Sequence, residues 1–270
     1  VDSRLLASEY YRRLSLYVRS MQVLQCNKDP IDLDHPSVSD VRLYLQYARL
    51  RNSLGGSKFA LLIINKLKIN QKIQFSKLVG PILLSNYKYQ DAYPIYKKVD
   101  SELSDHSDYP TRVHYLGLID TLTGLKDYKN ATDCLNRIEQ ISKEPLLKGI
   151  LCEIRGSILL MTGNYKEALN VLNSALNYFP ENTKTVDLGY LYKWIGASLV
   201  CLGDYTKADQ ELTKSWELLY RPGFKPEIWL EVLFWKGLLH FKLQPNEFPI
   251  QWKQILLYPK PDNYFQERIL

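Results

Sequence analysis

Few residues in this chain have the types and spacing that chemistry requires. The histidines form no His-Glu-x-x-His zinc motif, and no Gly-x-Ser-x-Gly sequence is present to expose a nucleophilic serine for acyl transfer. The run Gly55-Gly56-Ser57-Lys58 lacks the length of a phosphate-binding loop, and no strand is expected before it. A turn between helices explains these glycines. We therefore expect no catalytic residues and no bound cofactor. The histidines are His35, His106, His114 and His240.

The cysteines are equally uninformative about chemistry. Cys26, Cys134, Cys152 and Cys201 are widely spaced, with no Cys-x-x-Cys pair and no histidine at ligand spacing. A zinc site is therefore not expected. Each cysteine falls in a stretch with helical spacing, so we interpret all of them as buried free thiols. Free thiols are typical of a reducing compartment, and we expect an intracellular protein, cytoplasmic or nuclear.

The elements that would position any site are helices. Apolar residues recur at intervals of three and four along nearly the whole chain, and no stretch alternates with the period of two that predicts a strand. One amphipathic helix is expected from Ser3 to Leu24, followed by a connector rich in Pro and Asp that ends at Pro36. The longest tight apolar cluster, Phe59–Ile64, is far shorter than the roughly 18 residues that a membrane span requires. The sequence predicts an all-α fold without a membrane span.

Two segments of the chain repeat one another at an offset of 40 residues, 149–180 and 189–220. Glycines in mid-helix predict close approach of a second helix, because glycine otherwise costs about 1 kcal/mol there. Glycines at the end of the first helix suit the left-handed conformation of a helix C-terminus. Small residues follow where two helices would cross. Each segment therefore predicts a helical hairpin, and the matched pairs are Gly156 with Gly196, Gly163 with Gly203, Tyr165 with Tyr205 and Ala168 with Ala208.

These residues resemble the tetratricopeptide repeat, whose unit has a small residue in the first helix, Gly-Asp/Asn-Tyr at the turn, Ala three residues later and a closing Pro. Its unit has about 34 residues, against 40 here, and Tyr220 replaces the terminal Pro of the second copy. The resemblance implies a right-handed superhelical solenoid of antiparallel helical hairpins. The matching positions are Gly156, Gly163-Asn164-Tyr165, Ala168, Ala175 and Pro180, then Gly196, Gly203-Asp204-Tyr205 and Ala208.

Weaker copies extend the pattern on both sides and give about five to six repeats. The upstream copy has a first helix over 111–122 with Ile119 where Gly is expected. A further copy has Gly80 at the small position and Pro94 in the first turn of its second helix, where proline is tolerated. We divide the chain into an N-terminal helix and connector (1–36), a solenoid (37–248) and a C-terminal cap helix with its tail (249–270).

The resemblance places part of each first helix on the concave face of the solenoid. This face is mostly apolar, so a groove that takes a helix or an extended segment of a partner protein is expected. The alternative is that neighbouring helices cover the same side chains. The concave face lacks the cluster of Lys, Asn and Arg with which chaperone-binding members of the family hold a C-terminal carboxylate. The candidate positions are Glu153, Leu160, Met161, Tyr190, Lys193 and Val200.

Positive charge is concentrated in the first third of the chain. Residues 1–99 contain 16 Lys/Arg and 7 Asp/Glu, a net charge of +9, whereas residues 100–270 carry −3. An acidic protein or a nucleic acid would bind such a region, while a solvated surface without a ligand is the simpler interpretation. The arginines we assign to this region as candidate binding residues are Arg12, Arg13, Arg19, Arg42, Arg49 and Arg51.

Aromatic residues gather towards the C-terminus, at Trp229, Phe234, Trp235, Phe241 and Trp252. They predict either a hydrophobic seal over the last repeat or an exposed interaction surface. The chain begins with valine, and we expect a processed chain or a fragment of a larger protein.

Taken with the repeats, these features indicate a non-catalytic scaffold or adaptor that holds proteins in a larger complex. The alternatives are a helical-repeat protein that binds nucleic acid through its basic third, and a regulatory region of a longer enzyme.

Overall fold

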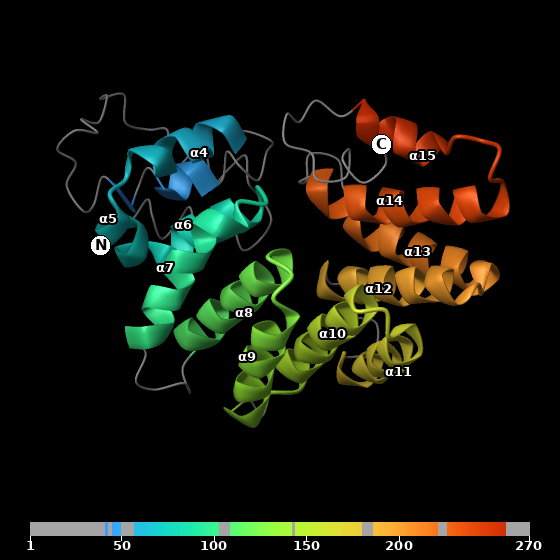
Figure 1. Ribbon diagram of the computed structural model, residues 1–270, viewed down its shortest axis with the longest axis horizontal. Helices are drawn as coiled ribbons and strands as arrows, with labels where there is room; N and C mark the ends of the chain where they lie inside the picture. Colours follow the sequence, from blue (N-terminus) through green and yellow to red (C-terminus); the bar gives the residue numbers. More distant parts are fainter. Residues whose placement is uncertain are drawn as a thin grey trace. The chain divides into compact units, whose positions relative to one another are not determined.

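The computed structural model describes residues 41–42, 45–49, 57–102, 109–141, 144–179, 186–220 and 226–257 (Figure 1). All regular secondary structure within these ranges is helical, which confirms the all-α prediction. The helix predicted over 3–24 lies outside the described residues. The chain forms two compact units, unit 1 (1–126 with 223–225) and unit 2 (127–222 with 226–270).

Unit 1 contains the helices α4 (Ser57–Lys66), α5 (Ile69–Gln74), α6 (Ser76–Leu84), α7 (Tyr89–Glu102) and α8 (Tyr109–Gly124). Helices α6, α7 and α8 pack on one another. The buried Tyr96 of α7 lies against two glycines, since a Cβ atom at Gly80 would lie 2.2 Å from its Oη and one at Gly117 would lie 2.4 Å from its Cζ. Because Gly80 of α6 and Gly117 of α8 have no side chains, the ring of Tyr96 fits between these two helices.

Gly117 of α8 approaches Tyr96 of α7, which belongs to the preceding hairpin, so this contact does not bear on the register of the weak repeat formed by α8 and the helix after it. One expectation for unit 1 needs correction. Pro94 is the sixth residue of α7, because the helix begins at Tyr89, and it therefore lies beyond the first turn. Proline in a helix interior removes one backbone hydrogen bond.

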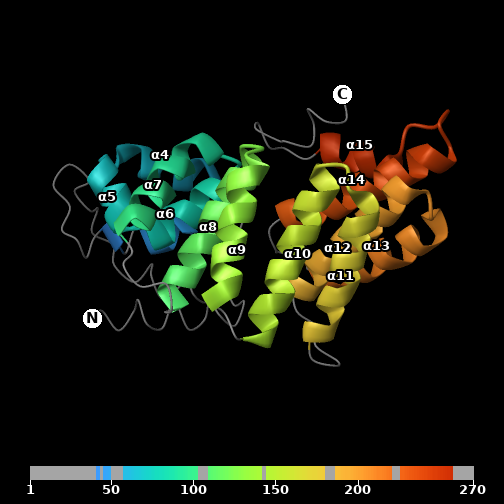
Figure 2. The same ribbon diagram turned by 60° about the horizontal axis from the view of Figure 1, so that its bottom comes forward.

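Unit 2 contains α9 (Tyr128–Ile141), α10 (Pro145–Met161), α11 (Tyr165–Ala175), a 3-10 turn η1 (Leu176–Tyr178), α12 (Val186–Leu202), α13 (Tyr205–Leu219), α14 (Pro226–Leu243) and α15 (Ile250–Leu256). Helices α10 to α15 each pack on the next in the chain, and α12 also contacts α10 and α14 (Figure 2). The most extensive contacts are those of α12 with α13 and of α10 with α11. The two predicted helical hairpins are thus confirmed as α10–α11 and α12–α13.

The glycines at the two hairpin turns have the predicted conformation. Gly163 has φ +85° and Gly203 has φ +84°, in the left-handed region that favours glycine. Asp204 caps α13 as expected, since its carboxylate accepts a hydrogen bond from the backbone N–H of Lys207 at 3.3 Å. Asn164 differs, because its side-chain amide donates instead to the Thr162 hydroxyl at 3.2 Å.

The mid-helix glycines mark the predicted helix contacts. A Cβ atom at Gly156 would lie 2.4 Å from Cγ of Leu172, and one at Gly196 would lie 2.7 Å from Cγ of Leu212. Ala168 is completely buried, as is its counterpart Ala208 at the matching position of the second hairpin. Among the described helices, none combines the length and the apolar character needed to cross a bilayer.

Candidate functional site

The arginines predicted to bind a partner fall largely beyond what the structure describes. Arg12, Arg13, Arg19 and Arg51 lie outside the described residues. Arg42 is exposed and Arg49 is half-buried, both in unit 1. The basic region therefore stays a prediction from sequence.

Three of the six predicted groove residues of unit 2 are not available to a partner in this structure. Leu160, Lys193 and Val200 are buried, so the prediction that these three side chains bind a partner is wrong for this structure. The physical reason is the alternative stated above: α12 packs on both α10 and α14, and these neighbouring helices cover the face. The half-buried positions are Glu153, Met161 and Tyr190.

Lys193 has a structural role that the sequence did not indicate. Its side chain is only 2% exposed, and its ammonium forms an ion pair with Glu231 of α14. The same ammonium lies 3.9 Å from the ring centroid of Trp194 and 4.8 Å from that of Tyr190. Aromatic faces and a carboxylate together satisfy a charge that burial alone would make costly. Lys193 therefore ties α12 to α14.

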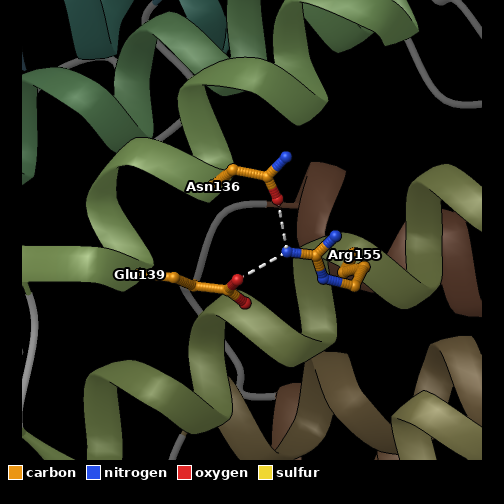
Figure 3. Close-up of polar contacts among 3 residues, drawn as sticks. All are labelled: Asn136, Glu139 and Arg155. Atoms are coloured by element: carbon orange, nitrogen blue, oxygen red, sulfur yellow. Dashed lines mark hydrogen bonds and ion pairs between the residues drawn. The ribbon is translucent and has the colours of Figure 1, made fainter.

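A second polar contact ties α9 to α10 (Figure 3). The Arg155 guanidinium donates hydrogen bonds to the Asn136 side-chain oxygen at 2.9 Å and to the Glu139 carboxylate at 2.6 Å. Both charged side chains are about one third exposed, at 29% and 34%. Water therefore competes for these groups, and the contact fixes the register of the two helices more than it adds stability.

The thiols of unit 2 are not built for chemistry. Within the described residues Cys134, Cys152 and Cys201 form no disulfide. Cys134 is buried as expected, whereas Cys152 and Cys201 are half-buried. Burial raises the pKa of the Cys152 and Cys201 thiols, which keeps them protonated and weakens them as nucleophiles. No cluster of metal-ligating side chains occurs in the described parts of the chain.

Part of the C-terminal aromatic cluster packs around Trp252. Trp252 of α15 lies across α14, where its indole N–H donates to the backbone oxygen of Phe234 at 3.1 Å. A Cβ atom at Gly237 would lie 2.2 Å from the same indole ring. The ring of Phe241 stacks on Trp252 with centroids 5.8 Å apart, and the ring of Phe248 meets Trp252 edge-on with centroids 6.0 Å apart. Both phenylalanines remain exposed. Trp252 thus packs over α14 as the predicted seal requires, and the interaction surface stays a prediction.

A cavity of about 490 Å³ opens between α13, α14 and α15. We call it the α13–α15 pocket. One wall is aromatic: Trp216 and Tyr220 stack with ring centroids 4.6 Å apart at 10°, and Trp229 meets both rings edge-on at 6.0 Å. The other lining residues are Leu233 and Lys236 of α14 and Ile250, Gln251 and Gln254 of α15.

The pocket combines apolar surface with a few polar groups. Lys236 is held by the Thr213 hydroxyl, which accepts a hydrogen bond from its ammonium at 2.9 Å, and its ammonium lies 3.8 Å from an Asp209 oxygen. The Oε1 atom of Gln251 is buried and has no hydrogen-bond partner among the described residues. The lining is thus mostly apolar and aromatic, with Lys236 as its charged side chain.

Sequence reasoning missed most of this pocket. The aromatic cluster predicted from the sequence includes Trp229 but not Trp216, and the sequence pattern does not indicate Lys236 or Gln251. The signal that could have found it is the spacing of Trp216 and Tyr220, because residues four apart lie on one face of a helix. No protein-family model matches the chain, and no curated protein matches its sequence.

Proposed function

We propose that this chain is a non-catalytic scaffold that binds other proteins through tetratricopeptide-like helical hairpins, as a subunit or region of a larger assembly. Support comes from the repeated hairpins α10–α11 and α12–α13, with glycines at matching turns and crossings. Sequential packing of hairpins is the architecture that proteins of this kind use to present extended binding surfaces.

The observation that carries the proposal is the α13–α15 pocket with its exposed rim. Tyr220 is 46% exposed and Ile250 is 62% exposed, beside an aromatic wall. Aromatic side chains in partly enclosed sites dominate the binding energy of protein interfaces. Apolar side chains that stay in contact with water around such a site favour a macromolecular partner that would cover them.

Affinity purification of the intact chain from its own cells, followed by identification of the bound proteins, tests this proposal. The matched variant is Tyr220→Ser with Ile250→Ser, which replaces two exposed side chains. Its thermal unfolding is compared with that of the natural chain, because Tyr220 also contacts Trp216 and Trp229. We expect at least one protein to be retained by the natural chain and lost with the variant. A set of bound proteins that is identical for both chains would contradict binding at this surface.

The same preparation distinguishes the nucleic-acid alternative, which the net charge of +9 in residues 1–99 favours. Binding of RNA or DNA that weakens steeply with salt, combined with no retained protein, would replace the scaffold proposal with that function.

A further inference from the structure

The positive charge of the first third of the chain is confined to one stretch of it. Residues 41–90 contain nine Lys and Arg and no Asp or Glu, which accounts for the whole net charge of +9 in residues 1–99. Helices α4, α5 and α6 of unit 1 lie in this stretch. Because the stretch has no carboxylate of its own to neutralise its lysines, the field at its surface attracts anions.

Within this stretch, the chain forms a protruding corner where α4 is followed by α5 (Figure 1). Of the six residues 65–70, only Leu67 is buried, and the other five are exposed. The helix α5 contributes no buried residue at all. A corner of this kind does not enclose a small ligand or a peptide, so the surface that binds it must accommodate a convex shape.

Exposed aliphatic and cationic side chains lie together on this corner. Leu62 and Lys66 are four residues apart and share a face of α4, and Ile69 and Lys72 are three apart and share a face of α5. Leu62 is 55% exposed and Ile69 is 52% exposed. Lys66, Lys68 and Lys72 form no ion pair within the described residues. We call these five residues the α4–α5 corner.

This combination of side chains discriminates among anionic partners. A nucleic acid binds lysines through its phosphates and stacks its bases on aromatic rings, but residues 60–74 include no aromatic residue. The two exposed aliphatic side chains would therefore stay in water. An anionic lipid bilayer satisfies both kinds of side chain, because its headgroups attract lysine and its acyl chains accept Leu and Ile. A bilayer also deforms around a convex corner, whereas a protein partner would need a matching cavity.

We propose that the α4–α5 corner binds the surface of a membrane that contains anionic lipids. Leu62 and Ile69 insert at the boundary between the headgroups and the acyl chains, while the three lysines contact the lipid phosphates and carboxylates. Binding is peripheral and reversible, because the inserted apolar surface is small. The proposal does not depend on the scaffold function, and a scaffold bound in this way would gather its partners at a membrane.

Co-sedimentation of the full chain with lipid vesicles tests the proposal. One set of vesicles contains phosphatidylcholine with about 30% phosphatidylserine, and the other contains phosphatidylcholine alone. We expect the chain to sediment with the anionic vesicles, much less with the neutral vesicles, and less with either as salt is raised. Equal binding to both sets, or binding to neither, would overturn the proposal.

Variants of the corner separate the two kinds of contact. Leu62→Ser and Ile69→Ser should each weaken vesicle binding about fivefold, because about half of each side chain leaves water, and their effects should multiply. Lys66→Gln, Lys68→Gln and Lys72→Gln should each weaken binding by about fivefold as well, and together they should remove the preference for anionic vesicles. Every replaced side chain is exposed or half-buried, and circular dichroism checks that each variant is folded.

Matched controls make the same chemical changes on unit 2. One control combines Lys148→Gln, Lys166→Gln and Lys253→Gln, at exposed lysines, and the other combines Leu243→Ser with Leu257→Ser, at exposed leucines. Both should bind the anionic vesicles as the natural chain does. Losses as large as those of the corner variants would show that total charge or total apolar surface, and not this corner, determines binding.

Three further results would overturn the proposal. Vesicle binding that the corner variants leave unchanged would show that another part of the chain contacts the membrane. Losses with the lysine variants but none with the serine variants would show that no side chain enters the bilayer. A single-stranded oligonucleotide that binds more tightly than the vesicles, and is lost with the lysine variants, would identify the partner as a nucleic acid.

Discussion

Glu231→Leu should destabilise unit 2 much more than Lys193→Met, although both substitutions break the same ion pair. Lys193 is 2% exposed, so after Glu231→Leu its ammonium stays buried without a carboxylate. The Glu231 side chain is 28% exposed, so after Lys193→Met water can reach the carboxylate that remains. Methionine also keeps the apolar length of the lysine stem against Trp194.

The magnitude follows from this asymmetry. Removing one partner of a buried pair typically costs about 3–5 kcal/mol. The partial exposure of Glu231 and the rings of Tyr190 and Trp194, which still face the ammonium, reduce this to about 2–3 kcal/mol for Glu231→Leu. Lys193→Met should cost about 1 kcal/mol or less, because replacing a buried charge by an apolar side chain is often neutral.

Urea unfolding followed by tryptophan fluorescence measures this difference. All five tryptophans of the chain lie in unit 2, so their emission reports this unit selectively. With a slope of roughly 1–3 kcal/mol per molar urea, Glu231→Leu should lower the midpoint by about 1 M or more. The double variant should recover most of this loss, because it leaves no unpaired charge.

Equal losses for the two single variants would refute the argument, since they would show that Lys193 and Glu231 are equally accessible to water. A double variant whose loss is the sum of the single losses would refute it as well, because residues in direct contact should not act additively.

The remaining predictions concern the turns, the crossings, a buried histidine and the basic third. Gly203→Ala should cost about 1–2 kcal/mol, because φ is +84°, and Gly203→Asn should cost less, as urea midpoints would show. Ala208→Trp, at a fully buried position, should cost about 1–3 kcal/mol or more by the same measurement, and an unchanged midpoint would contradict the assigned crossing. Burial lowers the pKa of His114 in unit 1, with Asp100 opposing and Lys77 reinforcing the shift. The unfolded chain therefore binds the proton more readily, and stability measured by circular dichroism should fall as the pH drops below about 6.5, a slope that His114→Phe should reduce. Reversing to Glu the arginines of the basic third should slow association with an acidic partner about tenfold or more in stopped-flow measurements, and an association rate indifferent to salt would contradict this. These arginines are Arg12, Arg13, Arg19, Arg42, Arg49 and Arg51.

The helical hairpins of unit 2 could be predicted because their determinants are local. A left-handed turn needs glycine at one position, and Gly163 and Gly203 meet that requirement whatever surrounds them. A close helix approach needs a missing side chain, which Gly156 and Gly196 supply. Gly80 of α6 meets the same requirement in unit 1, because Tyr96 of α7 fills the space beside it.

The candidate site could not be predicted in the same way, because burial is decided by other helices. A lysine at position 193 is expected to be exposed, because its charge favours contact with water. Glu231, 38 residues later, provides the opposite charge that allows Lys193 to be buried. The α13–α15 pocket likewise needs three consecutive helices to pack together. Residue type indicates what a side chain can do, while only packing decides which side chains meet.

The glycine contacts explain why the pocket occurs where it does. The space beside Gly156 is filled by Leu172, and the space beside Gly196 is filled by Leu212. Each leucine comes from the second helix of the same hairpin. The space beside Gly237 of α14 is filled instead by Trp252 of α15, so α15 takes the place of a second helix.

At 1.5 Å per residue, the seven residues of α15 span about 10 Å, against about 27 Å for the 18 residues of α14. A helix this short cannot cover its partner, and Trp229 and Leu233 near the start of α14 are left facing the cavity beside Trp216 of α13. A full-length second helix would fill this space with its own side chains. The shortness of α15 therefore leaves an aromatic cavity beside α13 and α14.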